Sequence, residues 1–164
     1  MRVGDLGEFG LIKRIAGKAK RKDKSVLVGI GDDAAVITPL FTPPSPPLNK
    51  GGMGGVRGGA GGVAPLLVTT DSLIEDVHFR RNHPPEALGW KALAVNISDI
   101  AAMGGVPEHY LLSLGIPEGI SVEYIDRFVN GMTEAAVEYG LSLVGGDTTS
   151  SPDRLYISVT VLGK

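Results

Sequence analysis

Apolar residues in this chain fall into short continuous runs and into longer stretches with helical spacing. The short runs lie near 26–30, 34–37, 66–68, 110–116, 141–144 and 154–162, which predicts strands there. The stretches 86–103 and 121–139 repeat apolar residues at spacings of three and four, which predicts helices. A shorter helix is predicted over 6–19. Strands and helices therefore alternate through most of the chain.

The two long helices differ in how their apolar residues are distributed. The helix over 86–103 is apolar on two faces, so it is expected to be buried on more than one side. In the second helix, Ser121 is expected at the N-cap and Gly140 at the C-terminal end. Its apolar positions predict one core-facing stripe with a purely structural role. The stripe comprises Val122, Ile125, Val129, Met132, Ala136 and Tyr139.

Residues 38–65 have a different composition from the rest of the chain. Prolines and glycines dominate this segment, and large apolar side chains are few. Such a segment cannot bury enough surface to offset its ordering entropy, which predicts a flexible insertion between two strands. Its glycines lack the lysine and helix of a phosphate-binding loop, so we expect no chemistry there.

Carboxylates and hydroxyls follow several of the predicted strands and helices. Thr69, Thr70 and Asp71 come directly after the apolar run 66–68, at what is predicted to be the end of a strand. Oxygen ligands of this kind suit magnesium, and magnesium suits phosphate. We expect side chains from distant parts of the sequence to converge on metal ions. The candidate ligands are Asp33, Thr69, Thr70, Asp71, Asp99 and Asp147.

Each candidate also has a structural interpretation. Asp32 and Asp33 follow glycine and fit a hairpin turn as well as a cation site. Asp99 lies near the C-terminal end of its predicted helix, where the helix dipole disfavours a carboxylate, so it needs either a metal or a basic partner. His78 lies between apolar residues and fits a structural role. Glu75 and Asp76 are interpreted as loop acids.

Composition limits the classes of function. The chain has 164 residues, which predicts one domain, and a formal net charge of −2, which gives no sign of a nucleic-acid-binding surface. It has no cysteine and no histidine pair at ligand spacing, which disfavours zinc. No apolar run is long enough to span a membrane, and the N-terminus lacks the apolar core of a signal peptide. We therefore expect a cytoplasmic protein without nucleic-acid or membrane partners.

An ordered set of motifs resembles a known family. The chain carries Gly7-Glu8-Phe9, Gly29-Ile30-Gly31-Asp32-Asp33-Ala34-Ala35, Thr69-Thr70-Asp71, Val77-His78-Phe79, the run 91–104 with Asn96-Ile97-Ser98-Asp99, and Gly145-Gly146-Asp147-Thr148-Thr149. Together they resemble the N-terminal domain of thiamine-monophosphate kinase. The resemblance covers the whole chain except the insertion.

The resemblance implies a reaction and roles for individual residues. It implies phosphorylation of thiamine monophosphate to thiamine diphosphate with MgATP, by in-line transfer with several magnesium ions. The metal ligands would be Asp33, Thr69, Thr70, Asp71, Asp99 and Asp147. Gly146 and Asp147 would also face ATP, and His78 would contact thiamine monophosphate.

The resemblance also implies an architecture. The fold would be α+β, a mixed sheet flanked by helices, as in the ATP-binding N-terminal domain of the aminoimidazole-ribonucleotide-synthetase-like type. Two such domains would pair their sheets into a barrel in a homodimer. The family's C-terminal domain is absent from 1–164, so the isolated chain is expected to be largely inactive. The alternatives are another ATP-dependent synthetase or maturation enzyme of the superfamily, and a non-catalytic, metal-stabilised dimerisation domain.

Overall fold

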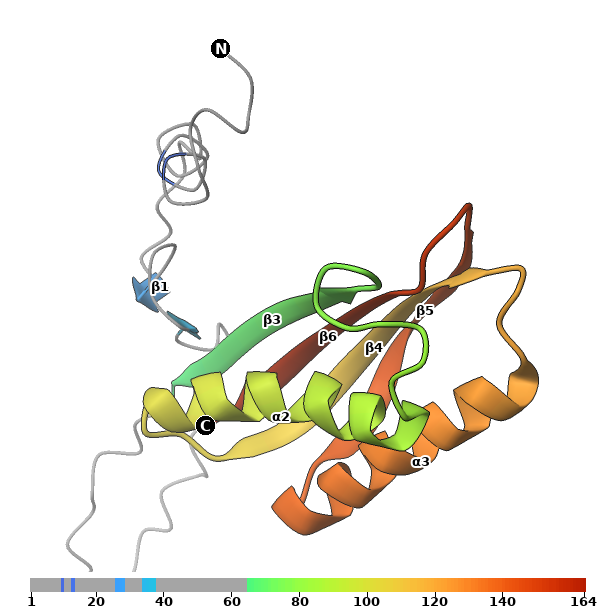
Figure 1. The fold of residues 1–164 in the computed structure, drawn as a ribbon. Helices are drawn as coiled ribbons and strands as arrows, with labels where there is room; N and C mark the ends of the chain where they lie inside the picture. The colour runs from blue at the N-terminus through green and yellow to red at the C-terminus, as the bar shows by residue number, and fades with distance from the viewer. Residues whose placement is uncertain (1–9, 11–12, 14–25, 29–33, 38–64) are drawn as a thin grey trace, which may run out of the picture.

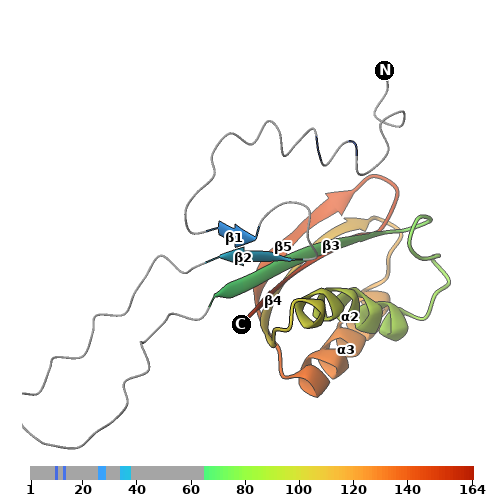
Figure 2. The ribbon, with the colours of Figure 1, turned by 90° about the vertical axis from the view of Figure 1, so that its left-hand side faces the viewer.

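The computed structural model describes residues 10, 13, 26–28, 34–37 and 65–164. Within them, one sheet is covered on one face by two helices (Figures 1 and 2). The strands are β1 (Val26–Val28), β2 (Ala35–Ile37), β3 (Leu66–Ile74), β4 (Pro107–Pro117), β5 (Ser142–Ser151) and β6 (Tyr156–Gly163). The helices are α2 (Pro85–Ala102) and α3 (Val122–Tyr139). This arrangement confirms the predicted α+β class with a mixed sheet.

The strand order is β1-β2-β3-β6-β4-β5, with β4 and β5 parallel and every other neighbouring pair antiparallel. Parallel neighbours need a crossover, and α3 provides it between β4 and β5. β2 and β3 pair directly across the 38–65 insertion. The prediction that the insertion joins two strands is therefore confirmed.

The core lies between the sheet and α2. Leu88, Leu93 and Ile100 of α2 are completely buried, and Ile157 and Val159 of β6 are almost so. Each such side chain contributes about 1.5–3 kcal/mol by leaving water. The alternation along β6 puts its apolar residues toward the helices and its polar residues on the open face of the sheet. The sheet therefore has one apolar face and one face rich in hydroxyls.

The predicted stripe on α3 is wrong in part: Met132 and Ala136 are buried as predicted, whereas Val122, Val129 and Tyr139 are exposed. The predicted ends of the helix are confirmed. Ser121 Oγ accepts the Tyr124 N–H at 3.1 Å, and Gly140 ends the helix in a left-handed conformation. Val122 is 77% exposed, however, whereas the buried residues are Phe128, Gly131, Met132, Ala135 and Ala136. The reason is a close approach of the helices: a Cβ on Gly131 would meet the backbone of Glu86 in α2. That contact sets the rotation of α3.

β3 is longer than the sequence indicated. It pairs with β6 from Leu67, opposite Gly163, to Ile74, opposite Tyr156. Thr69, Thr70 and Asp71 therefore lie inside the strand and not at its end, because β6 continues beside them. A strand interior alternates its side chains between two faces, and this decides which of the three residues can act together.

Several predictions lie outside the described residues. They are the helix over 6–19 apart from its residues 10 and 13, the Gly31-Asp32-Asp33 segment, and the 38–65 insertion apart from Pro65. Among the described residues, no helix is long and apolar enough to cross a membrane.

Candidate functional site

Thr69 and Asp99 meet between the sheet and α2. The Thr69 hydroxyl donates to Asp99 Oδ2 at 2.8 Å, which joins β3 to the last turns of α2. Thr69 is buried and Asp99 is half-buried. No lysine or arginine of the described residues forms an ion pair with Asp99. A hydroxyl is thus the partner seen for a carboxylate at the unfavourable end of a helix.

Asp71 belongs to the same side of the sheet. It lies opposite Val159, which faces the core, and two residues along β3 from Thr69. Burial raises the pKa of the Asp71 carboxyl, and the charge of Asp99 raises it further, while His78 opposes the shift. A carboxylate whose ionised form is disfavoured by a neighbouring carboxylate attracts a cation to the space beside it. Thr69, Asp71 and Asp99 therefore form one oxygen-rich group, here called the carboxylate cluster.

Thr70 and Asp147 lie on the opposite, open face of the sheet. Thr70 Oγ1 donates to the Val159 carbonyl at 3.1 Å and accepts from Thr160 Oγ1 at 3.0 Å. Asp147 is exposed on β5 and pairs in register with Ser113, which in turn pairs with Ser158. From β3 to β5 there are three strand spacings, about 14 Å. Within one chain, Asp147 and the carboxylate cluster are therefore too far apart to bind the same ion.

Gly146 has a structural reason to be glycine. Its φ is 155°, and a Cβ at this position would meet the backbone of Leu112 in β4. The close packing of β4 and β5 accounts for this residue without a nucleotide. The predicted contact between Gly146 and ATP stays a prediction.

The candidate ligand Asp33 lies outside the described residues. Among the residues that the structure does describe, no group of three or more His, Cys, Asp or Glu side chains could hold a metal ion. The carboxylate cluster contributes two carboxylates and one hydroxyl. All three ligands are oxygens, which fits magnesium and leaves further positions for water and phosphate.

His78 lies in a tight turn directly after β3. Its N–H donates to the Ile74 carbonyl at 2.9 Å, and its Nδ1 accepts the Ile74 N–H at 3.0 Å. Lys91 of α2 donates to the His78 carbonyl at 2.9 Å. The imidazole is exposed, and its charge influences Asp71. The structure thus places His78 in the turn after β3, where it influences the Asp71 carboxyl electrostatically.

Glu75 lies in the turn after β3, as expected for a loop acid, but its burial and pairing were not predicted. Glu75 is buried and forms a bidentate pair with Arg81, at 2.5 Å from Nε and 2.6 Å from Nη2. Its Oε2 also accepts the Leu155 N–H at 2.9 Å. The hydrogen bond from Arg81 holds the pKa of Glu75 below its usual range. The sequence offered one signal, Arg81 six residues after Glu75, but that spacing has no meaning without the turn.

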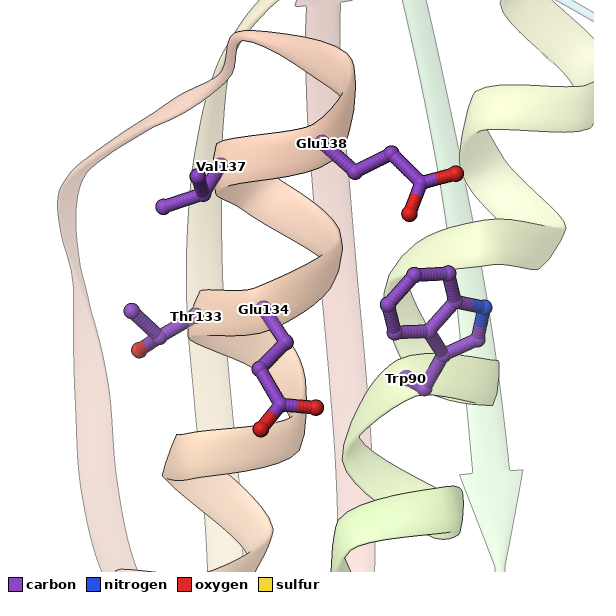
Figure 3. Close-up of a pocket in the computed structure, with 5 residues that line it drawn as sticks. All are labelled: Trp90, Thr133, Glu134, Val137 and Glu138. Carbon is purple, nitrogen blue, oxygen red and sulfur yellow. The ribbon is translucent and has the colours of Figure 1, made fainter.

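Two hollows lie away from the carboxylate cluster. One, of about 570 Å³, lies between the helices and is lined by Trp90, Thr133, Glu134, Val137 and Glu138 (Figure 3). Trp90 is nine residues before Asp99, which is about 13 Å along α2. The other, of about 440 Å³, lies at the N-terminal ends of both helices and includes Arg81, Tyr124 and Arg127. Neither contains a predicted ligand.

Comparison with known proteins decides the family. Residues 31–164 match the family described as "AIR synthase related protein, N-terminal domain". The chain belongs to this family. In AIR synthase related proteins the matched region is the N-terminal domain, and the prediction that the chain resembles that domain is confirmed.

Two similar relatives carry a more specific name than that of the AIR synthase related family. The chain is 42% identical over 160 residues to "Thiamine-monophosphate kinase" of Bacillus subtilis (strain 168), covering 97% of this chain and 42% of the relative. It is 39% identical over 164 residues to the protein of that name from Aquifex aeolicus (strain VF5), covering 100% of this chain and 44% of the relative. The chain thus spans less than half the length of these relatives.

A solved structure agrees with these relatives. The structure described as "AaThiL complexed with AMPPCP and TMP" is 38% identical and superimposes with a TM-score of 0.78. The match covers 99% of this chain and 43% of that chain. The resemblance to thiamine-monophosphate kinase therefore extends from the motifs to the fold.

Proposed function

We propose that this chain is the ATP- and magnesium-binding domain of a cytoplasmic thiamine-monophosphate kinase. The enzyme would transfer the γ-phosphoryl group of ATP to a phosphate oxygen of thiamine monophosphate. The bond from the γ-phosphorus to the bridging oxygen breaks, and ADP and thiamine diphosphate are the products. The observation that carries the proposal is Asp71 beside Asp99, two carboxylates whose repulsion a cation would relieve.

The carboxylate cluster is the proposed core of the metal site. Asp71 and Asp99 would hold magnesium, with the Thr69 hydroxyl orienting Asp99. When bound, magnesium would neutralise phosphate charge, which is the main catalytic need in phosphoryl transfer. Asp33 is proposed as a further ligand, because it comes two residues before β2 in the sequence, and β2 is the neighbour of β3. The residues of this chain would then bind and orient the reacting phosphates.

Thr70, Gly146 and Asp147 are proposed to act elsewhere in the site. Because Thr70 and Asp147 are about 14 Å apart across the sheet, they would serve different ions. Gly146 and Asp147 would face ATP from β5. We propose several magnesium ions for this reason: one chain distributes its ligands over both faces of the sheet.

His78 is the proposed contact to thiamine monophosphate. Its imidazole is exposed in the turn after β3 and influences the Asp71 carboxyl electrostatically. A substrate held there would lie next to the metal that neutralises its phosphate. The relative crystallised with AMPPCP and TMP supports the choice of both substrates.

We propose that two copies associate through the open face and edge of the sheet, and that a second domain completes the site. β5 is an edge strand whose residues are almost all exposed, including Leu143 at 52% and Val144 at 56%. An exposed edge strand that carries apolar side chains such as these favours pairing with another chain. Since the relatives are more than twice as long, the 164-residue chain alone is expected to lack robust turnover.

Titration calorimetry with a non-hydrolysable ATP analogue tests the proposal. Nucleotide binding is expected with magnesium and not without it, and Asp99→Asn is expected to weaken or abolish the binding seen with magnesium. Glu134→Gln, an exposed carboxylate of α3 on the side of Trp90 and away from the carboxylate cluster, is the matched control and should bind as the wild type does (Figure 3). A thermal shift with calcium that does not depend on nucleotide would favour a metal-stabilised domain without catalysis instead.

A further inference from the structure

The turn that carries His78 is closed at both ends by one ion pair. Glu75 lies at the start of the turn and Arg81 at its end, and the two side chains form a bidentate pair. Inside it, the Asp76 N–H donates to the Phe79 carbonyl at 2.7 Å. Asp76 has a φ of 64°, in the left-handed region that aspartate tolerates better than most residues. The pair therefore fixes a loop with an unusual backbone conformation.

The same carboxylate attaches the turn to the sheet. The Glu75 N–H donates to the Leu155 carbonyl at 3.0 Å, and Glu75 Oε2 accepts the Leu155 N–H at 2.9 Å. Glu75 thus satisfies both backbone groups of Leu155, next to the start of β6. The glutamate is 5% exposed, so water does not compete for these contacts.

The turn determines the protonation of the His78 ring. Because Nδ1 accepts the Ile74 N–H at 3.0 Å, the neutral imidazole carries its proton on Nε2. An Nε2–H group on an exposed ring is a hydrogen-bond donor available to a ligand oxygen. Lys91 holds the His78 carbonyl from α2, the helix that also carries Asp99. The ring and the carboxylate cluster are therefore attached to the same two elements, β3 and α2.

We propose that Glu75 is a positioning residue for substrate binding. Through Arg81 and Leu155 it holds the turn so that His78 keeps its proton on Nε2 and presents that N–H to a phosphate or other anionic oxygen of thiamine monophosphate. This rests on the proposed function for the identity of the ligand. It assigns Glu75 and Arg81 a role that does not involve contact with substrate.

The ring nitrogens of His78 report on this role without any substrate. In a ¹⁵N-labelled chain, long-range spectra of the imidazole are expected to show an unprotonated Nδ1 and a protonated Nε2 for His78. The signals are assigned by their absence in His78→Gln, since the chain has two other histidines, 83 and 109. In Glu75→Gln the spectrum is expected to show exchange between tautomers, as in a free imidazole.

A second variant and a matched control keep the test decisive. Arg81→Lys retains the charge and the Leu155 contact but loses the bidentate geometry, so it decides the question if Glu75→Gln does not fold. Glu86→Gln breaks the similar bidentate pair of Glu86 with Arg127, at 2.5 and 3.0 Å between α2 and α3. This control is expected to leave the His78 tautomer unchanged.

Binding of thiamine monophosphate, measured by calorimetry, gives the second readout. Glu75→Gln and Arg81→Lys are expected to weaken it about tenfold while leaving the affinity for the ATP analogue unchanged. Folded variants that keep the Nε2–H tautomer and the wild-type affinity would overturn the proposal, as would a changed tautomer in Glu86→Gln. If the wild type binds no thiamine monophosphate, the proposed function fails, and the tautomer comparison still decides the role of Glu75.

Discussion

At the scale of single residues, repulsion between Asp71 and Asp99 in the carboxylate cluster reduces the stability of the fold, and a bound cation would relieve it. Asp71 carries a raised pKa because it is partly desolvated and faces the charge of Asp99. Asp99 has the hydroxyl of Thr69 as its hydrogen-bond partner. A group of this kind reduces stability in return for binding, which is common where a ligand supplies the missing charge.

Replacing Asp71 is therefore expected to stabilise the chain and to impair metal binding. A raised carboxyl pKa means that the folded state holds the proton more tightly than the unfolded state. The contribution of Asp71 to stability is then fully present below the unfolded pKa of about 3.8 and is lost as pH rises through the folded pKa. Asp71→Asn should gain about 0.5 kcal/mol at pH 7 in urea denaturation without magnesium.

The gain of Asp71→Asn should vanish at low pH, where the wild-type carboxyl is also neutral. Glu134→Gln, which changes an exposed carboxylate on α3 to an amide, should stay close to the wild type at both pH values. A loss of stability in Asp71→Asn at pH 7 would contradict the electrostatic account.

The hydroxyl of Thr69 is expected to matter for stability as well. Thr69→Val keeps the shape but leaves the Asp99 carboxylate without this donor, which should cost about 1–2 kcal/mol in the free energy of unfolding. Thr133→Val on the exposed side of α3 makes the same chemical change at the surface, where a change within about 0.5 kcal/mol is expected. Equal losses in both variants would show that the contact between β3 and α2 contributes little.

At the scale of elements, strand register decides which predicted ligands can cooperate. Adjacent residues of a strand point to opposite faces, so Thr69 and Thr70 cannot serve one ion once both lie inside β3. Sequence reasoning found the threonines and the aspartate from their place after an apolar run. It could not find the end of β3, because the polar residues 69–72 are held in the sheet by β6, which is distant in sequence.

Prediction of the helices from the sequence is limited in the same way. The ends of α3 were predictable, because Ser121 and Gly140 act locally. The buried face was predictable only in part, because it also depends on the contact of Gly131 with the backbone of α2. The burial and pairing of Glu75 were missed for a related reason: its partners Arg81 and Leu155 meet only in the folded turn.

A methyl group at the helix contact is expected to separate α2 from α3. Gly131→Ala would place a Cβ against the backbone of Glu86, which side-chain movement cannot relieve. We expect a loss of about 1–3 kcal/mol in the free energy of unfolding, measured by thermal denaturation. At Gly119 a Cβ would meet nothing within 4 Å, so Gly119→Ala is the control and should stay within about 0.5 kcal/mol. Similar stability of the two variants would contradict the packing described for α3.

At the scale of the whole molecule, the proposed site is expected to extend beyond one copy of this chain. The carboxylate cluster lies on the helix-covered side, while Asp147 lies on the open face about three strands away. The relatives extend well beyond the matched region. The chain is therefore expected to associate through its sheet and to bind metal, but to turn over thiamine monophosphate only when joined to the remaining domain.

Sedimentation and activity assays separate these expectations. The 164-residue chain should sediment as a dimer, and Val144→Lys on the exposed edge strand β5 should shift it toward the monomer. Val137→Lys, on the exposed side of α3, is the control and should leave the dimer intact. Robust turnover by the isolated chain would contradict the need for a second domain.

The most direct test of the central claim is to locate a bound divalent ion. Manganese can replace magnesium at oxygen ligands, and its unpaired electrons broaden the amide signals of nearby residues. The account predicts that substoichiometric manganese broadens the signals of Thr69, Asp71 and Asp99 first, and that excess magnesium restores them. Broadening that begins instead at Glu134 and Glu138, or that leaves the carboxylate cluster unaffected, would contradict it.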